Sequence, residues 1–326
     1  MSRFLWLPAI SFLATLLPAQ QSVLNGPVEG YAFDAPTRSF RAVIGFPGSA
    51  ALGPSIAEGF DFGSVAPRKD YALAFKENQC TFISGFDSGN VTEVAIPGAF
   101  AQPDGVAWST DGSLAVLFSR SGAWLQKLAI SSSRNFSAPV DLSVLGPSLS
   151  AITIDAQGRQ VAVGIAGETG GAFLLTDSDA LVPLLPGSKP VSLAFSTDGS
   201  KLFVLDGGAF QLTELRLADS TSQAFSLDGL TDPVAVKSYR DGANRQVLLV
   251  ASRGDYLLRA YDVASREVLT EITLDFQARS IEDFGRSSFL LAPRSKDGEP
   301  IWLFTSAPRQ AVYFVPATPL TSGGAR

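Results

Sequence analysis

The sequence predicts an all-β protein built from a repeated four-stranded unit. Two observations predict this fold class: pairs of short apolar strands joined by a turn recur along the chain, and helical periodicity is almost absent outside the first residues. The composition agrees, because 46% of the 326 residues are hydrophobic, with 30 glycines and 20 prolines. That mixture suits many short strands connected by turns.

The first half of the unit is a hairpin with a glycine in its turn. The stretch PVSLAFSTDGSKLFVLDGG at residues 190–208 shows it most clearly: an alternating strand, a turn at Asp198-Gly199, and a more apolar strand. The turn glycines of successive copies are separated by 46, 41, 43 and 43 residues: Gly112, Gly158, Gly199, Gly242 and Gly285. The copies span residues 104–122, 149–167, 190–208, 233–254 and 280–298, and one step back leads to 67–70.

The second half of the unit is another hairpin, which we expect on the outer side of the sheet. Such hairpins are predicted at residues 80–96, 124–145, 210–227 and 301–315. Residues 32–38 (AFDAPTR) match residues 260–266 (AYDVASR) in the character of nearly every position, 228 residues apart. We therefore also interpret 32–38 as an outer hairpin.

A sheet of four short strands exposes apolar residues on both faces, so it cannot bury itself. Copies must stack face to face around an axis, which is the architecture of a β-propeller. Residues 62–316 hold six inner strand pairs, which suits six blades. Residues 20–61 form one further period and favour seven, with a degenerate first unit that joins the two ends of the chain.

Three segments resemble the repeat halves of YVTN, TolB-like and WD-repeat propellers of the bacterial secreted type. They are FSTDGSKLFVLDGG (195–208), WSTDGSLAVLFSRSG (108–122) and RAYDVASREVLTEI (259–272). The resemblance covers most of residues 28–316 and implies the fold rather than an activity. The Trp-Asp ending and Gly-His pair of WD repeats are missing, as is the Tyr-Val-Thr-Asn segment.

The first residues have the pattern of a secretory signal peptide. One basic residue, Arg3, precedes the apolar stretch 4–17, and small residues lead to a cleavage site after Ala19. The stretch is shorter than the ~20 residues that span a bilayer. We expect a signal peptide at 1–19, a propeller domain at 20–316 and a flexible tail at 317–326. The expected location is periplasmic or extracellular, with no membrane span in the mature chain.

The composition excludes several kinds of catalytic and metal-binding site. The protein has no histidine, and Cys80 is its one cysteine. This excludes Ser-His-Asp and Cys-His catalysis, imidazole zinc sites and intramolecular disulfides. The net charge of −6 and the lack of a basic stripe argue against nucleic-acid binding. We interpret Cys80 as a buried small hydrophobe.

Four motifs are candidate sites, and a structural role is expected for each. The first is a set of aspartates that suits turns: Asp104, Asp111, Asp198, Asp206, Asp228, Asp241 and Asp297. Residues 177–179 (DSD) have too few oxygen ligands for a calcium loop. GPVEG (26–30) and PDGVA (103–107) faintly resemble gluconolactonase-type propellers, which hold an axial divalent cation. GETGG (167–171) has no following helix to bind phosphate.

The sequence therefore predicts a secreted, non-catalytic, monomeric binding module for a protein, peptide or glycan. It identifies no catalytic, cofactor-binding or metal-binding residue, and we expect no cofactor. The alternative is a metal-dependent hydrolase or lactonase of gluconolactonase type with an axial cation. A quinone-dependent dehydrogenase and a structural module are further classes. Trp108, Trp124 and Trp302 are expected to pack in the core or between blades.

Overall fold

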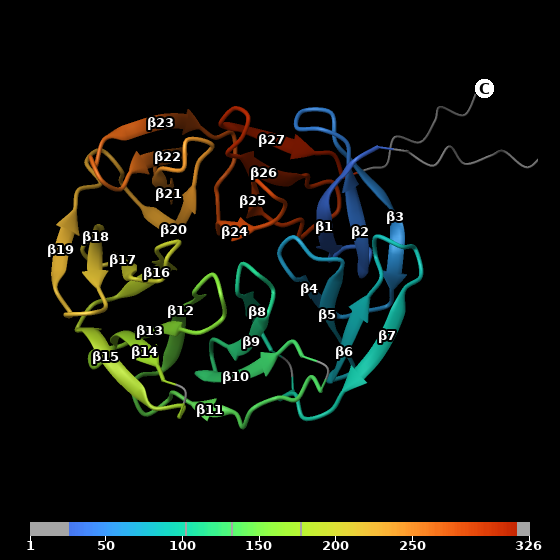
Figure 1. The fold of residues 1–326 in the computed structure, drawn as a ribbon, viewed down its shortest axis with the longest axis horizontal. Coiled ribbons are helices and arrows are strands. Elements are labelled where there is room, and N and C mark those ends of the chain that lie inside the picture. The colour runs from blue at the N-terminus through green and yellow to red at the C-terminus, as the bar shows by residue number, and fades with distance from the viewer. Residues whose placement is uncertain (1–25, 102, 132, 177, 318–326) are drawn as a thin grey trace, which may run out of the picture.

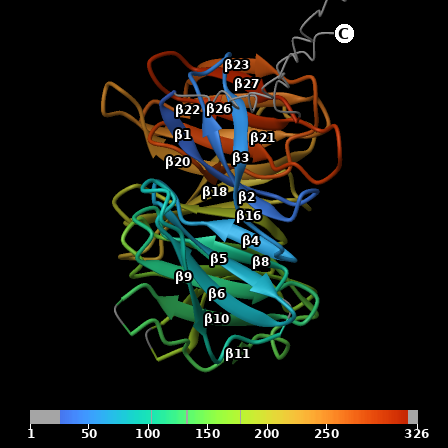
Figure 2. The same ribbon diagram turned by 90° about the vertical axis from the view of Figure 1, so that its right-hand side faces the viewer.

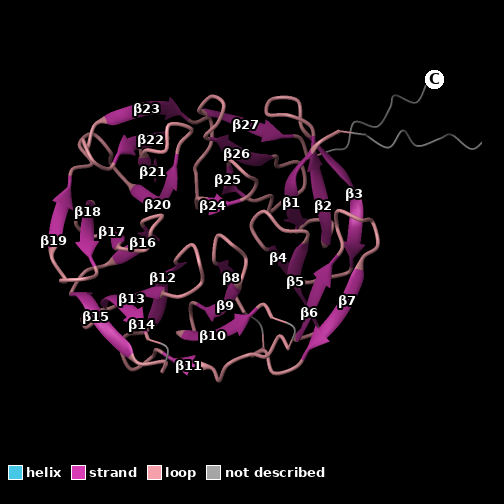
Figure 3. Cartoon of the chain, viewed as in Figure 1, coloured by secondary structure: helices cyan, strands magenta, loops and turns pink. Residues whose placement is uncertain are grey.

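The computed structural model describes residues 26–317 except 102, 132 and 177, and it is a β-propeller of seven blades around a central axis (Figure 1). Strands and loops make up the described residues, with no helix among them (Figure 3). Six blades are antiparallel sheets of four strands and one has three strands. The sequence prediction of seven blades is confirmed. The signal peptide and most of the tail fall outside the described residues.

The blades are contiguous in sequence. Blade I contains β1 (Val28–Asp34), β2 (Ser39–Ile44) and β3 (Ala51–Glu58). Blade II contains β4 (Phe62–Val65), β5 (Tyr71–Lys76), β6 (Gln79–Ser84) and β7 (Thr92–Ile96). Blade III contains β8 (Gly105–Trp108), β9 (Leu114–Ser119), β10 (Trp124–Ala129) and β11 (Val140–Asp141). Blade IV contains β12 (Ser148–Ile154), β13 (Val161–Ala166), β14 (Gly171–Leu175) and β15 (Leu181–Pro186).

The last three blades follow the same order. Blade V contains β16 (Pro190–Phe195), β17 (Lys201–Asp206), β18 (Gln211–Arg216) and β19 (Ser222–Phe225). Blade VI contains β20 (Pro233–Arg240), β21 (Gln246–Ser252), β22 (Leu257–Asp262) and β23 (Val268–Thr273). Blade VII contains β24 (Glu282–Asp283), β25 (Ser288–Ala292), β26 (Ile301–Thr305) and β27 (Ala311–Val315).

In each four-stranded blade the first strand lies nearest the axis and the fourth lies at the rim (Figure 1). Because neighbouring strands are antiparallel, the connections between them lie alternately on two opposite faces of the ring. We call one the inner-turn face, since it carries the turns between first and second strands. These turns are at 66–70, 109–113, 155–160, 196–200, 241–245 and 284–287. The other is the connector face, since it carries the loops from one blade to the next.

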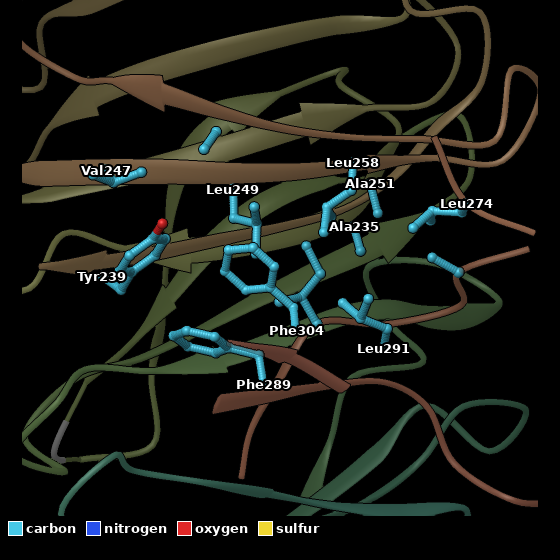
Figure 4. Packing of buried hydrophobic residues seen from close by; sticks show 13 residues of the cluster. Ala235, Tyr239, Val247, Leu249, Ala251, Leu258, Leu274, Phe289, Leu291 and Phe304 are labelled. Carbon is cyan, nitrogen blue, oxygen red and sulfur yellow. The ribbon is translucent and has the colours of Figure 1, made fainter. Parts of the chain in front are cut away.

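The core lies between blades rather than within them. Alternate residues of β17 show why: Leu202 and Val204 pack against blade IV, whereas Phe203 and Leu205 pack against blade VI. The seven hydrophobic clusters of the described chain correspond to the seven contacts between adjacent blades. Figure 4 shows the cluster between blades VI and VII, where Tyr239 packs against Phe289 with ring centroids 5.2 Å apart.

The repeated turn is held by the same hydrogen bonds in different blades. In blade V, Ser196 Oγ donates to Asp198 Oδ1 at 2.6 Å, and the backbone N–H of Ser200 donates to that oxygen at 3.0 Å. Ser109, Asp111 and Ser113 repeat this arrangement in blade III. Gly199 has a φ of 72°, which explains the glycine. The aspartates of these two turns are therefore turn residues.

The first blade differs from the sequence prediction. Tyr31 Oη, early in β1, donates to Asp87 in the β6–β7 turn on the inner-turn face. At the other end of β1, the N–H groups of Gly59 and Phe60 donate to the carbonyl of Arg38, and Asp61 accepts from the β5–β6 turn on the connector face. β1 therefore runs in the direction of a second strand. Blade I has strands at the second, third and fourth positions, and blades I and II stand side by side in Figure 2.

The interpretation of residues 32–38 as an outer hairpin is therefore wrong. This hairpin joins the second and third positions and points to the connector face, whereas 260–266 joins β22 and β23 on the inner-turn face. The two segments look alike because each turn ends at an arginine with a positive φ. Arg38 and Arg266 have φ values of 52° and 63° at equivalent places. Turn chemistry, rather than position in the blade, caused the similarity.

Candidate functional site

The central channel is the candidate site, because the first strands of six blades bring polar and charged side chains there. A cavity of about 230 Å³ occupies the channel toward the connector face. A second cavity of about 360 Å³ opens on the inner-turn face. Asp283, the last residue of β24, lines both cavities, as do Thr153, Ile154 and Lys237.

Asp283 links three blades across the axis. Its Oδ2 accepts hydrogen bonds from Lys237 Nζ of blade VI at 2.7 Å and from Thr110 Oγ1 of blade III at 2.9 Å. The side chain of Asp283 is only 5% exposed. Burial opposes its ionisation, but the Lys237 ammonium, the Arg68 guanidinium and the Thr110 hydroxyl keep the pKa of Asp283 below its ordinary value. Asp283 is therefore the anionic centre of an axial network.

Glu282 has the opposite electrostatic behaviour. Its side chain is reached by solvent in the channel, yet protein surrounds it on all sides, and this loss of hydration raises its pKa. Lys237 and Arg120 partly oppose the increase, and the charge of Asp283 adds to it. Adjacent carboxyl groups with opposite pKa shifts are found at some acid–base sites. Here Asp283 already accepts hydrogen bonds from Lys237 and Thr110, so we assign it a structural role in the axial network.

We call the cavity on the inner-turn face the basic pocket. Arg68, Arg240, Arg286 and Lys237 line it together with Asp283, so four cations against one carboxylate leave three net positive charges. Arg68, Arg240 and Arg286 are exposed. The excess is notable in a protein whose net charge is −6. The pocket therefore has the charge of an anion-binding site.

Hydroxyl groups complete the lining of the basic pocket. They come from Thr110, Thr153, Ser196, Thr197, Ser238, Tyr239, Ser287 and Ser306. The Oγ1 atom of Thr197 is buried and has no hydrogen-bond partner within the described residues. A buried polar atom without a partner costs free energy, so a ligand oxygen that bonded it would be stabilising. Phe195 and Phe289 form an apolar part of the wall.

The motifs singled out from the sequence lie outside this pocket. Glu29 accepts from Ser288 Oγ at 2.6 Å near the inner-turn face, whereas Asp104 accepts the N–H of Arg120 at 2.5 Å at the connector face. The two motifs that resemble gluconolactonases are therefore on opposite faces of the ring. Within the described residues, no group of three or more acidic or cysteine side chains is arranged to hold a metal ion.

The other candidates from the sequence lie in turns, in an ion pair or in the core. Asp177 is outside the described residues, and Asp179 forms an ion pair with Lys127 at 2.6 Å. GETGG is the turn between β13 and β14. Cys80 is buried, which confirms its interpretation as a buried small hydrophobe, and burial raises the pKa of its thiol to about 12.

Two of the three strand tryptophans pack as predicted. Trp108 donates from Nε1 to Ser64 Oγ at 2.9 Å, and Trp302 stacks on Phe276 with centroids 4.2 Å apart. Trp124 differs, because it is 39% exposed at the start of β10.

Sequence reasoning missed the basic pocket because its charged residues are far apart in the chain. Arg68, Lys237 and Arg286 come from three different blades, and only closure of the ring places them together. The one available signal was that arginine or lysine occurs in or beside several inner turns. No turn alone indicates a site.

Comparison with known proteins agrees with the fold. No protein-family model matches the sequence, and no curated protein matches it. Among solved structures, a chain of a nidogen/laminin complex matches with a TM-score of 0.52 and 14% identity, over 76% of this chain and 95% of that one. Dihydro-heme d1 dehydrogenase NirN in complex with DHE matches with 0.59 and 13%, over 93% and 67%.

A third similar structure is the β-propeller domain of Cps50 (Swd1) from Myceliophteria thermophila. Its TM-score is 0.55 at 9% identity, over 78% of this chain and 86% of that domain. At these identities the likeness establishes the architecture alone. The protein is a seven-bladed β-propeller. No helix in the described part of the chain is long and apolar enough to cross a membrane.

Proposed function

We propose that this protein is a secreted, non-catalytic binding propeller that takes an acidic segment of a partner protein into its basic pocket. The observation that carries the proposal is the excess of three positive charges around a cavity of about 360 Å³. The fold supports it, because propellers present a rigid ring of loops on which binding residues from several blades converge.

The exposure of the arginines favours a macromolecular partner over a small enclosed ligand. Small-molecule pockets bury most of their ligand against apolar walls. Here the cations lie at an open mouth and are surrounded by hydroxyl groups. Arginine matches carboxylates with paired N–H donors, so acidic side chains on an extended segment fit this surface. The cationic mouth would also accelerate encounter with such a partner at low salt.

Binding of an acidic probe tests the proposal. Fluorescence anisotropy with a labelled hexaglutamate peptide should show saturable binding that weakens as salt increases. The double variant Arg240→Gln, Arg286→Gln should weaken binding about tenfold or more, because it removes two of the charges. Arg309→Gln is the matched control, because Arg309 is exposed on the same face but does not line the pocket.

Two results would contradict the proposal. One is the absence of saturable peptide binding, and the other is an equal loss in the double variant and the control. Inorganic phosphate and citrate are measured in parallel. If they bind and the peptide does not, the pocket is a small-anion site and the protein-partner proposal is wrong.

Export is part of the proposal and rests on the apolar stretch 4–17 and the small residues before Gln20. Expression with residues 1–19 intact, followed by fractionation and mass determination of the N-terminus, tests it. A mature chain that begins at Gln20 outside the cytoplasm is expected.

A further inference from the structure

The cavity of about 230 Å³ in the channel, which we call the connector cavity, holds charges of both signs. Its charged lining residues are Arg120, Arg279, Lys237, Glu282 and Asp283. Lys237 and Asp283 neutralise each other in an ion pair at 2.7 Å. The other three form no ion pair within the described part of the chain. Two cations and one carboxyl group therefore remain for a ligand.

These three charged groups lie at different depths in the connector cavity. Arg120 is in the β9–β10 turn, which lies on the connector face. First strands run from the connector face to the inner-turn face, and Arg279 precedes the first strand of blade VII. Glu282 begins that strand and is followed by Asp283, which also lines the basic pocket. The two arginines are therefore at the mouth of the cavity, and Glu282 is deeper.

The guanidinium group of Arg120 is held in place by the protein itself. Its Nη1 donates to the carbonyl of Ser150 in blade IV at 2.9 Å, and its Cζ lies 5.2 Å from the centre of the Phe118 ring. Its other side-chain N–H groups make no hydrogen bond among the described residues, so they can bind a carboxylate. A donor that is already ordered loses less conformational freedom on binding, which favours affinity.

Two serine hydroxyls in the wall of the connector cavity can also donate to a ligand. Ser150 Oγ is buried and has no hydrogen-bond partner in the described chain. Ser192 Oγ accepts the N–H of Val236 at 3.1 Å, and this is its one hydrogen bond among the described residues, so its own proton is available. A buried hydroxyl without a partner costs free energy, and a ligand oxygen that accepted from it would remove that cost.

We propose that the connector cavity binds a small zwitterion, a free α-amino acid, with its carboxylate at Arg120 and Arg279 and its ammonium group at Glu282. A simple anion would be repelled by Glu282 and a simple cation by the two arginines, so neither complements all three charges. The cavity is smaller than the roughly 300–1,000 Å³ of sites for drug-sized ligands, so the ligand is small. Burial raises the pKa of Glu282, and an ammonium group beside it would favour the ionised form.

Isothermal titration calorimetry tests the proposal with L-alanine and with two analogues that each lack one of its charged groups. Propionate lacks the ammonium group, and ethylamine lacks the carboxylate. Alanine should bind saturably and at least tenfold more tightly than either analogue, because each analogue loses a charge-assisted contact. The other standard α-amino acids are titrated in parallel. If none of them binds saturably, or if either analogue binds as tightly as alanine, the proposal is wrong.

Two substitutions assign the two ends of the amino acid. Glu282→Gln should weaken alanine binding at least tenfold and leave propionate binding unchanged or tighter, because only the ammonium contact is lost. Arg279→Gln should weaken the binding of alanine and of propionate but not that of ethylamine. Arg253→Gln is the matched control, since Arg253 is exposed on the connector face but does not line the cavity. Equal losses in Arg279→Gln and Arg253→Gln would also overturn the proposal.

The double variant Arg240→Gln, Arg286→Gln separates this site from the basic pocket. It should bind alanine as the parent protein does, because neither arginine lines the connector cavity. Loss of alanine binding in this variant would place the amino acid in the basic pocket and contradict the proposed site.

Discussion

Asp34 and Arg294, 260 residues apart in the chain, form a buried ion pair that connects the first blade to the last. Arg294 Nη1 lies 2.8 and 2.9 Å from the two carboxylate oxygens of Asp34, and neither side chain is more than 6% exposed. Arg41 Nη1 approaches the same carboxylate at 3.2 Å, and Thr37 Oγ1 donates to it at 2.6 Å. Within the described residues, blades I and VII share no sheet. Side-chain contacts therefore close the ring.

Breaking this pair should destabilise the propeller strongly. Arg294→Met removes the nearest cation from the buried Asp34 carboxylate but leaves Arg41 and Thr37 as its partners, so the cost should be about 3 kcal/mol, the lower end of the range for breaking a buried pair. Urea denaturation followed by tryptophan fluorescence measures the loss. Arg216→Met is the control, since its ion pair with Asp219 is exposed and worth about 1 kcal/mol or less. Equal effects of the two substitutions would show that Asp34–Arg294 does not hold the ring closed.

The turn at Asp198 predicts a dependence of stability on acid. Hydrogen bonds from Ser196 and Ser200 lower the pKa of Asp198 to about 2. A group whose pKa is lowered in the folded state stabilises the protein above its unfolded pKa of about 3.9, and this contribution disappears as the pH falls through about 2. Asp198→Ala should therefore cost about 1 kcal/mol at pH 7. The difference from the parent protein should shrink between pH 4 and pH 2. A difference that stays constant over this range would contradict the assignment.

The axial network predicts an effect of Asp283 on anion binding. Asp283→Ala releases Lys237 from its ion pair and removes the one carboxylate in the lining of the basic pocket. Affinity for hexaglutamate should therefore rise about fivefold, which corresponds to about 1 kcal/mol of charge interaction. Asp297→Ala is the control, because the side chain of Asp297 is 90% exposed and lies outside the pocket. If hexaglutamate bound Asp283→Ala with unchanged or lower affinity, the axial network would not weaken anion binding in the basic pocket.

The alternative of a lactonase-type enzyme makes a different prediction about metal. The binding proposal needs no cation, so purified mature protein should contain no stoichiometric divalent metal, and EDTA should leave its melting temperature unchanged. Elemental analysis and a thermal melt with and without EDTA measure both quantities. A stoichiometric cation whose removal lowers the melting temperature would favour the alternative.

The sequence was sufficient for the repeat, and hence for the fold, because each inner hairpin carries its own local information. The Ser196–Asp198–Ser200 hydrogen bonds and the positive φ of Gly199 are satisfied within a few residues, so they leave a periodic pattern. Leu202 and Phe203 are adjacent in β17 and point to opposite faces of the sheet. Both are apolar, which likewise indicates a strand buried on both faces. The sequence of a turn does not determine its position in a blade, since the similar turns ending at Arg38 and Arg266 are on opposite faces of the ring.

The site and the closure of the ring were decided only by tertiary structure. Arg68, Lys237 and Arg286 approach one another, and Asp34 meets Arg294, because seven blades complete a circle. Nothing near any of these residues in the sequence signals its partner, because the partners lie far away in the chain. The sequence by itself thus determined the repeated unit and its turns. The arrangement of the blades around one axis determined which charged residues meet, since long-range packing alone fixes those distances.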